Sequence, residues 1–216
     1  MLGDEKLWAS DVVANCDMNR LRRLDGPNSY TRELGFNPLD LNPKAWLDLC
    51  CGSGRALIDA SRRTTATLIG VDLVDAFDEA DTVDFVCAPV DRYEPQHTFD
   101  LVTCVHGLHY VGDKLGLLAR AAGWLTPAGR FVADVDPASI QVEGLTTRQV
   151  VNQLRRAGFS YDARRKRISR TGPAETEFPY TYLGADDRAG PNYTGQPAVT
   201  SHYGPPTRGP RPRPTG

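Results

Sequence analysis

From residue 45 onward, short apolar runs alternate with helical stretches, and this alternation constrains the fold more than any other feature. Two stretches with helical spacing lie between the runs, Gly54–Arg63 and Lys114–Leu125. Strands that alternate with helices indicate βαβ units, and near-continuous apolar runs indicate strands covered on both faces. We therefore expect a doubly wound α/β fold, with a mostly parallel sheet and helices on both faces. The five predicted strands are Ala45–Cys50, Thr67–Val71, Asp84–Cys87, Phe99–Val105 and Arg130–Val135.

Further elements are predicted on either side of this core. Thr146–Ala157 has one apolar face and is expected to be a helix that Gly158 ends; Phe159–Ser169 and Glu177–Leu183 are strand candidates. Residues 1–43 are expected to form a helical cap. The apolar residues at helical spacing in this cap are Leu7, Trp8, Val12, Val13 and Cys16. Domain limits follow as 1–43 for the cap, 44–185 for the α/β domain, and 186–216 for an extended Pro/Gly-rich tail, disordered from residue 204.

Composition excludes several classes of protein. The net charge of −2 argues against a general nucleic-acid binder. No apolar run approaches the roughly 18 residues that a membrane span needs, and Met1–Lys6 has no signal-like pattern. Five cysteines without a CxxC pair make a disulfide framework or a zinc site a poor interpretation, so no metal is expected. We expect a cytoplasmic protein that does not contact a membrane.

The segment Leu47–Arg55 carries the strongest chemical signal. A predicted strand ends in a tight turn at Gly52 and Gly54, and a helix follows at once. Glycine allows the backbone to approach a ligand closely, and the helix N-terminus offers free N–H groups at the carboxyl end of a parallel strand. Leu57 stands where a dinucleotide-binding GxGxxG fingerprint needs its third glycine. Asp48, inside the strand, suits a ligand with an ammonium group and would repel a pyrophosphate.

A second acidic residue strengthens this interpretation. Asp72 ends the strand Thr67–Val71, eighteen residues after Gly54. A carboxylate at the tip of the second strand can accept hydrogen bonds from both hydroxyls of a ribose.

With these two acids and the glycine turn, the sequence resembles the class I S-adenosylmethionine-dependent methyltransferases. The family's first motif reads acidic-x-x-x-Gly-x-Gly, and its second strand ends in an acidic residue. The resemblance continues through Asp84–Asp91, Phe99–Val102, His106–Tyr110 and Leu125–Arg130, in the order that the family has. It implies a seven-stranded sheet whose last strand is antiparallel, the cofactor S-adenosyl-L-methionine and the product S-adenosyl-L-homocysteine.

The resemblance also implies a cofactor site. Asp48 and the glycine turn would hold the methionine portion, Asp72 the ribose, and Pro89–Asp91 the adenine edge. Two departures from the family stand out. First, Pro89 occupies the place of the usual adenine-binding acid, so that Asp91 or a backbone carbonyl would substitute. Second, only eleven residues separate Asp72 from Asp84, so the helix between these strands is short or absent. The expected cofactor-binding residues are Asp48, Cys50, Gly52, Gly54, Asp72, Leu73, Pro89, Val90, Asp91 and Cys104.

The sequence indicates the catalytic residues less clearly than it indicates the cofactor site. His106 and His109 follow the fourth strand, where either could remove a proton from an attacking hydroxyl or amine. Alternatively, His109 or Tyr110 only packs the loop, and positioning alone carries the reaction. Tyr30, His106 and Tyr110 are the candidate substrate-binding residues. Tyr30 belongs to a polar cluster in the cap with Arg20, Asn28 and Arg32, in a segment that folds over the cofactor in many relatives.

The expected function is methyl transfer to an O, N or C nucleophile of a small metabolite or natural-product intermediate. Two alternatives stay open: an RNA methyltransferase that uses the arginine-rich segment Arg155–Arg170, or a non-catalytic cofactor-binding subunit. We interpret the arginine-rich segment as a solvated face. Because it lies far along the chain from the catalytic loop, neutralising Arg164, Arg165 and Arg167 is expected to leave turnover almost unchanged.

Overall fold

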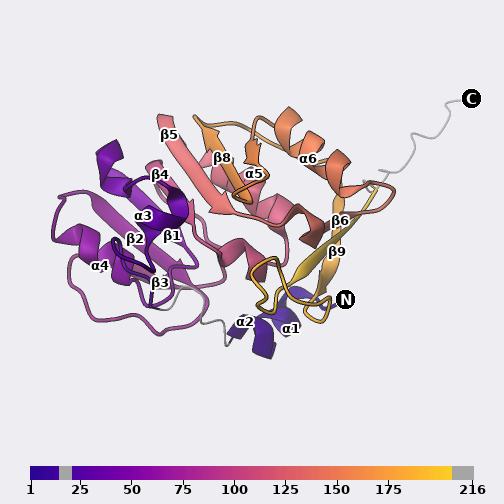
Figure 1. The fold of residues 1–216 in the computed structure, drawn as a ribbon, viewed down its shortest axis with the longest axis horizontal. Helices are drawn as coiled ribbons and strands as arrows, with labels where there is room; N and C mark the ends of the chain where they lie inside the picture. Colours follow the sequence, from indigo (N-terminus) through magenta and orange to yellow (C-terminus); the bar gives the residue numbers. More distant parts are fainter. Residues whose placement is uncertain (15–20, 206–216) are drawn as a thin grey trace, which may run out of the picture.

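The computed structural model describes residues 1–14 and 21–205, and its centre is a seven-stranded sheet (Figure 1). The strand order is β3-β2-β1-β4-β5-β8-β7. The first five strands in this order are mutually parallel, whereas β8 runs antiparallel to both of its neighbours. This confirms the doubly wound, mostly parallel sheet with an antiparallel last strand. The strands are β1 (Ala45–Leu49), β2 (Thr67–Asp72), β3 (Asp84–Cys87), β4 (Phe99–Cys104), β5 (Leu125–Asp134), β7 (Ser160–Asp162) and β8 (Arg167–Thr171).

Helices cover both faces of this sheet. On one face, α3 (Tyr30–Leu34), η1 (Pro38–Leu41) and α4 (Arg55–Ser61) pack in a core that includes Trp46 of β1. On the other face, α5 (Lys114–Gly123) and α6 (Thr147–Arg156) pack in a core that includes Leu47 and Leu49. Successive side chains of a strand point to opposite faces, so the continuous apolar run of β1 supplies both cores.

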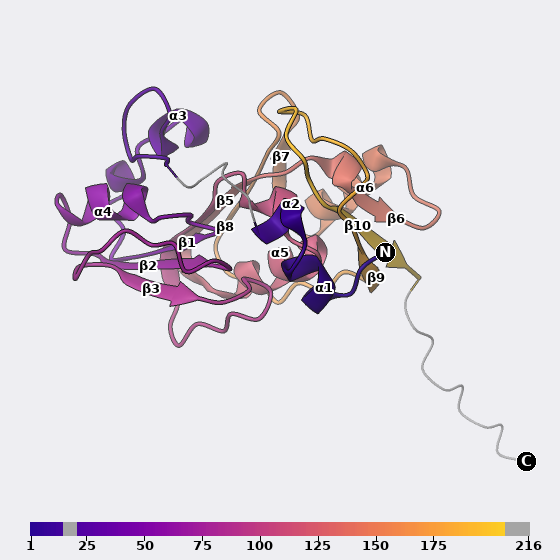
Figure 2. The same cartoon turned by 90° about the horizontal axis from the view of Figure 1, so that it is seen from below.

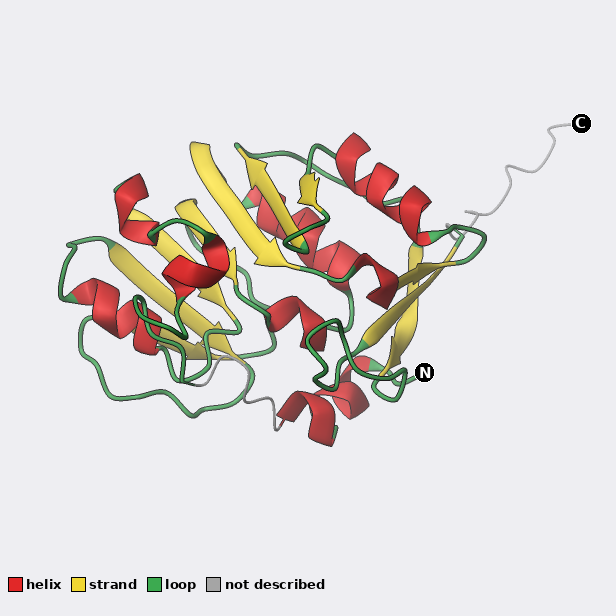
Figure 3. Ribbon diagram, in the orientation of Figure 1, coloured by secondary structure: helices red, strands yellow, loops and turns green. Residues whose placement is uncertain are grey.

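The connection from β2 to β3 contains no helix. All of residues 73–83 are described, and none is helical; Figure 3 draws this stretch as a long loop. The expectation of a short or absent helix, drawn from the eleven-residue spacing, is confirmed. As a result, the loop itself lies at the carboxyl end of the sheet, and it contributes Leu73, Val74 and Ala76 to the cavity described below.

The predicted single strand Phe159–Ser169 is wrong. The chain instead forms a hairpin of β7 and β8, with a turn between them in which Lys166 is left-handed at φ +52°. The carboxylate of Asp162 accepts hydrogen bonds from the backbone N–H groups of Arg164 and Arg165. An Asp side chain that bonds backbone N–H groups two and three residues on stabilises a turn, and that local signal outweighs the strand-like composition.

The last part of the described chain belongs to a second sheet of order β6-β10-β9. Its strands are β6 (Ile140–Val142), β9 (Thr181–Asp186) and β10 (Thr200–Gly204). The predicted strand Glu177–Leu183 corresponds to β9, but β6 and β10 were not predicted, and β10 lies inside the stretch 186–216 expected to be an extended tail. Residues 206–216, on which the expected disorder mainly falls, lie outside the described residues.

The N-terminal segment lies against this second sheet. It forms the short helices α1 (Asp4–Trp8) and α2 (Asp11–Ala14), drawn in indigo beside β9 and β10 in Figure 2. Leu2 bridges Ala185, and Leu7 and Val13 pack with Val199. Cys16, predicted on the same apolar face, lies outside the described residues. Over residues 1–14 and 21–205, no helix has the length and apolar character to cross a membrane.

Candidate active site

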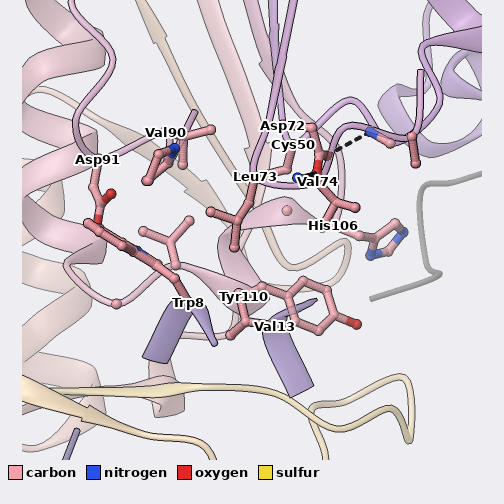
Figure 4. Close-up of a pocket in the computed structure, with 16 residues that line it drawn as sticks. Trp8, Val13, Cys50, Asp72, Leu73, Val74, Val90, Asp91, His106 and Tyr110 are labelled. Carbon is pink, nitrogen blue, oxygen red and sulfur yellow. Dashed lines mark hydrogen bonds between the residues drawn. The ribbon is translucent and has the colours of Figure 1, made fainter. Parts of the chain in front are cut away.

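A cavity opens at the carboxyl ends of β1, β2 and β4 (Figure 4). Strands β1 and β4 are neighbours in the sheet, but the chain proceeds from them in opposite directions. Open α/β sheets bind ligands at such a reversal of strand order. The cavity wall combines the turn after β1, the loops after β2, β3 and β4, and the N-terminal helices. Its lining includes Trp8, Val13, Cys50, Gly52, Asp72, Leu73, Val74, Pro89, Val90, Asp91, His106, Gly107 and Tyr110.

The turn after β1 and the tip of β2 are joined by hydrogen bonds. The Asp72 carboxylate accepts the Gly52 N–H at 2.8 Å and the Val74 N–H at 3.1 Å, drawn as dashed lines in Figure 4. Cys50 and Gly52 both have left-handed backbones, at φ +56° and +61°. Asp72 is therefore held in one orientation at the cavity wall. A carboxylate oxygen can accept more than one hydrogen bond.

Gly54 has a different role from the one expected. In the described structure it does not line the cavity, and a Cβ atom there would lie 2.2 Å from the ring of Phe85. Its backbone is also left-handed, at φ +75°, at the N-cap of α4. Gly54 is thus needed for the turn and for packing against β3.

Asp48 also lies away from the cavity wall that the structure describes. It shares a strand face with Trp46 and is only 1 % exposed. Its two oxygens accept hydrogen bonds from the Tyr30 hydroxyl at 2.7 Å and from the Thr103 hydroxyl at 2.6 Å. Burial raises the pKa of Asp48 to about 7 against the effect of these two donors. The structure thus joins Asp48 and Tyr30 to each other, and it places neither with the cavity-lining residues.

The loop after β3 forms the far end of the cavity. Pro89, Val90 and Asp91 all line it. The Oδ1 atom of Asp91 is buried and has no hydrogen-bond partner among the described residues, and burial raises the pKa of this carboxyl group. Trp8 lies beside Asp91 in Figure 4. This end therefore combines an apolar wall with one unused acceptor.

Sequence reasoning missed the contribution of the N-terminal helices to the cavity. Trp8 of α1 and Val13 of α2 line the cavity from the N-terminal segment. Both belong to the apolar set that predicted the helical cap, but that pattern does not say which surface the cap covers. The guanidinium of Arg92 lies 4.5 Å from the centre of the Trp8 ring, which favours this ring position through a cation–π contact.

His106 lies at the other end of the cavity, in a left-handed backbone conformation at φ +56°. Its Nε2 atom is 3.1 Å from the Glu33 carboxylate, and its backbone N–H donates to Asp134. The hydrogen bond with His106, together with the charges of His106 and Arg22, lowers the pKa of Glu33 to about 2. An ionised Glu33 favours the His106 tautomer that carries its proton on Nε2. The Nδ1 atom has no hydrogen-bond partner among the described residues.

The predicted site residues near His106 differ in whether they line the cavity. Tyr110 lines the cavity with His106. His109 and Cys104 are fully buried, and neither is among the described lining residues. Burial, with the charges of His106 and Lys114, lowers the pKa of His109 to about 3. Of the two candidate bases, His106 is the one that lies at the described cavity wall.

A second, polar cavity shares His106 with the first. Four arginines from distant parts of the sequence line it. Arg22 precedes α3 and Arg32 lies in α3, whereas Arg165 and Arg167 belong to the β7–β8 hairpin. Separation along the chain was therefore a wrong reason to detach the arginine-rich segment from the catalytic loop, because the antiparallel β8 returns Arg167 beside β5. Arg20, from the same predicted cluster as Arg32, lies outside the described residues.

Comparison with known proteins gives one family. The sequence profile of the "Methyltransferase domain" family matches residues 22–169. A ubiquinone biosynthesis O-methyltransferase of Rhodopseudomonas palustris is 30 % identical over 118 residues, which cover 47 % of this chain and 46 % of that protein. The enzyme of the same name from Thiobacillus denitrificans is 30 % identical over 124 residues, or 48 % and 53 % of the two chains. This chain thus aligns with about half the length of these relatives.

Among solved structures, the N-methyltransferase NodS of Bradyrhizobium japonicum, in complex with S-adenosyl-L-homocysteine, is 15 % identical to this chain. The alignment covers 79 % of this chain and 96 % of NodS, with a TM-score of 0.49.

Proposed function

The chain belongs to the methyltransferase domain family, and from this premise we propose that it methylates a small molecule, using S-adenosyl-L-methionine as methyl donor. The proposal for the methyl acceptor rests on one observation, the His106–Glu33 pair. His106 lines both the first cavity and the polar cavity, and Glu33 lines the polar cavity. This pair suits an acceptor that must lose a proton, and a hydroxyl group above all.

The residues of the first cavity fit the cofactor. Asp72, held by the N–H groups of Gly52 and Val74, would accept hydrogen bonds from the ribose hydroxyls. The buried, unpartnered Oδ1 atom of Asp91 offers the acceptor that an adenine amine needs, at the place where Pro89 replaces the usual acid. The turn through Cys50 and Gly52 would hold the methionine portion. We propose no ligand contact for Asp48, Gly54 or Cys104.

The cofactor supplies a methyl group on a sulfonium, which the protein does not need to activate further. What the chain adds is alignment of the acceptor, exclusion of water and removal of a proton. Glu33 keeps the proton of His106 on Nε2, so the Nδ1 lone pair is available for the acceptor's proton. Leu73, Val74 and Tyr110 supply apolar surface on the cavity wall.

An oxygen nucleophile is the acceptor best supported. A hydroxyl group is a weak nucleophile until it loses its proton, and a histidine oriented by a carboxylate is a common base for this step. The matched relatives are named as O-methyltransferases, which agrees with this choice. Methylation of RNA and a role as a non-catalytic subunit are the alternatives.

Two measurements test the proposal. Calorimetry with S-adenosyl-L-methionine, S-adenosyl-L-homocysteine and NAD should show binding of the two sulfur compounds and none of NAD. Incubation with S-adenosyl-L-methionine carrying a labelled methyl group and a cell extract should then place the label in small molecules. Label in RNA would support the first alternative. Cofactor binding without transfer to small molecules, RNA or protein would support the second.

A further inference from the structure

The polar cavity beside His106 contains more positive charge than its own carboxylates neutralise. Four arginines and two carboxylates, Glu33 and Asp134, line it together with Tyr193 and Thr194. Both carboxylates are already engaged by His106, through its ring and its backbone N–H respectively. Glu33 also accepts a hydrogen bond from Arg22 at 2.9 Å. The acids of the cavity are therefore used mainly to fix His106 and Arg22.

Guanidinium donors remain unused in this cavity. The Nε atoms of Arg22 and Arg167 are buried and have no hydrogen-bond partner among the described residues. Arg32 donates to the backbone carbonyl of Pro27, and Arg167 to that of Glu33. Arg165 donates to the exposed carboxylate of Asp162. A guanidinium carries five N–H donors in a planar fork, so each of these side chains keeps donors for a ligand.

Two other basic residues of the arginine-rich segment have partners outside this cavity. Arg170 donates to the backbone carbonyls of Ala157, Gly172 and Pro173, which makes it part of the fold. Lys166 lies 3.8 Å from the Asp136 carboxylate. A protein that follows a nucleic-acid backbone needs a basic groove along many phosphates, whereas the four arginines described above line a single cavity.

We propose that this cavity binds the methyl acceptor through an anionic group, a carboxylate or a phosphate, which Arg32, Arg165 and Arg167 hold while the acceptor's hydroxyl lies toward His106. The proposal rests on the methyltransferase function proposed above and specifies its substrate class. A fork of N–H donors matches the paired oxygens of a carboxylate or phosphate, and a fixed anion would orient the rest of a small acceptor toward the first cavity. It also reverses the sequence-based expectation for Arg165 and Arg167.

Binding of simple probes tests this without knowledge of the natural acceptor. Benzoate, inorganic phosphate and the neutral probe benzamide are titrated by NMR into the protein saturated with S-adenosyl-L-homocysteine. We expect saturable binding of at least one of the two anions and none of benzamide, and the better anion identifies the group. Arg165→Gln should weaken that binding by about tenfold or more, as expected for a lost charge-assisted hydrogen bond.

Arg164→Gln is the matched control, because it removes the same charge from the neighbouring position of the same turn, and Arg164 does not line the described cavity. Arg167→Lys keeps the charge but removes the fork, so it should weaken anion binding. Because Arg167 also donates to the backbone carbonyl of Glu33, the thermal unfolding midpoint of this variant is measured beside its anion affinity. Absence of saturable anion binding, or equal effects of Arg164→Gln and Arg165→Gln, would overturn the proposal.

Titration with S-adenosyl-L-homocysteine alone separates a failure of the proposed methyltransferase function from a failure of the proposed anion site. If S-adenosyl-L-homocysteine itself fails to bind, the proposed function is wrong. If it binds and the anions do not, only the anionic acceptor is wrong. A single-stranded RNA oligonucleotide is titrated as well; binding that falls steeply with salt and that Arg164→Gln also weakens would contradict the small-acceptor proposal in favour of RNA.

Discussion

The hydroxyl of Tyr30 donates a 2.7 Å hydrogen bond to the carboxylate of Asp48, and both side chains are almost completely buried. This contact joins α3 to β1. Asp48, the acid of the first motif, therefore anchors α3 to the sheet. It also accepts a hydrogen bond from Thr103 on β4.

The first prediction concerns the pH dependence of stability. Because the pKa of Asp48 is about 7 in the folded protein and about 3.9 in an unfolded chain, the folded state binds the proton more tightly. Its contribution to stability is full below about pH 4 and is lost as the pH rises through about 7. Urea unfolding at pH 5 and pH 8 should show this loss, and Asp48→Asn should reduce it. An unchanged pH dependence in that variant would contradict the assignment.

Tyr30→Phe should lower the free energy of unfolding by about 1.5–3 kcal/mol at pH 8, where Asp48 is mainly ionised, because a hydrogen bond to a charged group is lost. The loss should be smaller at pH 5. Tyr180→Phe, at a partly exposed tyrosine before β9, is the control and should have little effect at either pH. Equal losses for Tyr30→Phe at both pH values would show that the bond does not depend on the charge of Asp48.

The second prediction concerns the cofactor. Asp72→Ala should weaken binding of S-adenosyl-L-homocysteine by at least about tenfold, since it removes an acceptor for ribose hydroxyls worth about 1.5–3 kcal/mol. Asp75→Ala removes a carboxylate from an exposed position of the same loop and should leave the affinity unchanged. Calorimetry measures both. Normal affinity in a folded Asp72→Ala variant would disprove the ribose site.

The third prediction concerns the proposed base. His106→Asn keeps a residue that tolerates the left-handed backbone, and it should lower kcat by about 10²–10⁴, the usual contribution of a positioned base. Affinity for S-adenosyl-L-homocysteine should change little. Full turnover in this variant would leave positioning alone as the source of catalysis.

Glu33→Gln separates orientation from proton transfer. It keeps an acceptor for His106 Nε2 but removes the charge, so kcat should fall less than in His106→Asn. The lowered pKa of Glu33 also stabilises the folded protein above about pH 4.5, and this contribution is lost as the pH falls toward about 2. Unfolding measured across this range should show a weaker acid destabilisation in Glu33→Gln than in the wild type.

The fourth prediction concerns Lys114, which is fully buried at the start of α5. Its Nζ atom donates to the carbonyls of Val111 and Val199 and to the Ser201 hydroxyl, at 2.7–3.1 Å. These three bonds join the loop after β4 to β10. Lys114→Met should destabilise the protein by at least about 1–3 kcal/mol, the cost of one unsatisfied buried polar group. Hydrogen exchange should show faster opening of β10; unchanged protection there would contradict this role.

Much of the fold followed from local signals in the sequence. Apolar runs placed β1 to β4 within one or two residues, because strand burial and length appear directly in composition. Glycine in the turn after β1 marked a left-handed backbone that other residues rarely adopt, and the spacing to Asp72 located the tip of β2. Together these features determined the family and one half of the candidate cofactor site.

Tertiary structure alone decided which polar groups meet. Asp48 and Asp72 had equal standing in the sequence, yet the alternation of side chains along β1 turns Asp48 toward α3, while Asp72 ends its strand at the cavity. Glu33, His106 and Arg167 are each separated by more than sixty residues. The first two meet because α3 packs beside the loop after β4, and Arg167 joins them because β8 returns antiparallel beside β5. Contacts of this kind depend on packing between distant elements, which no local pattern of residues records.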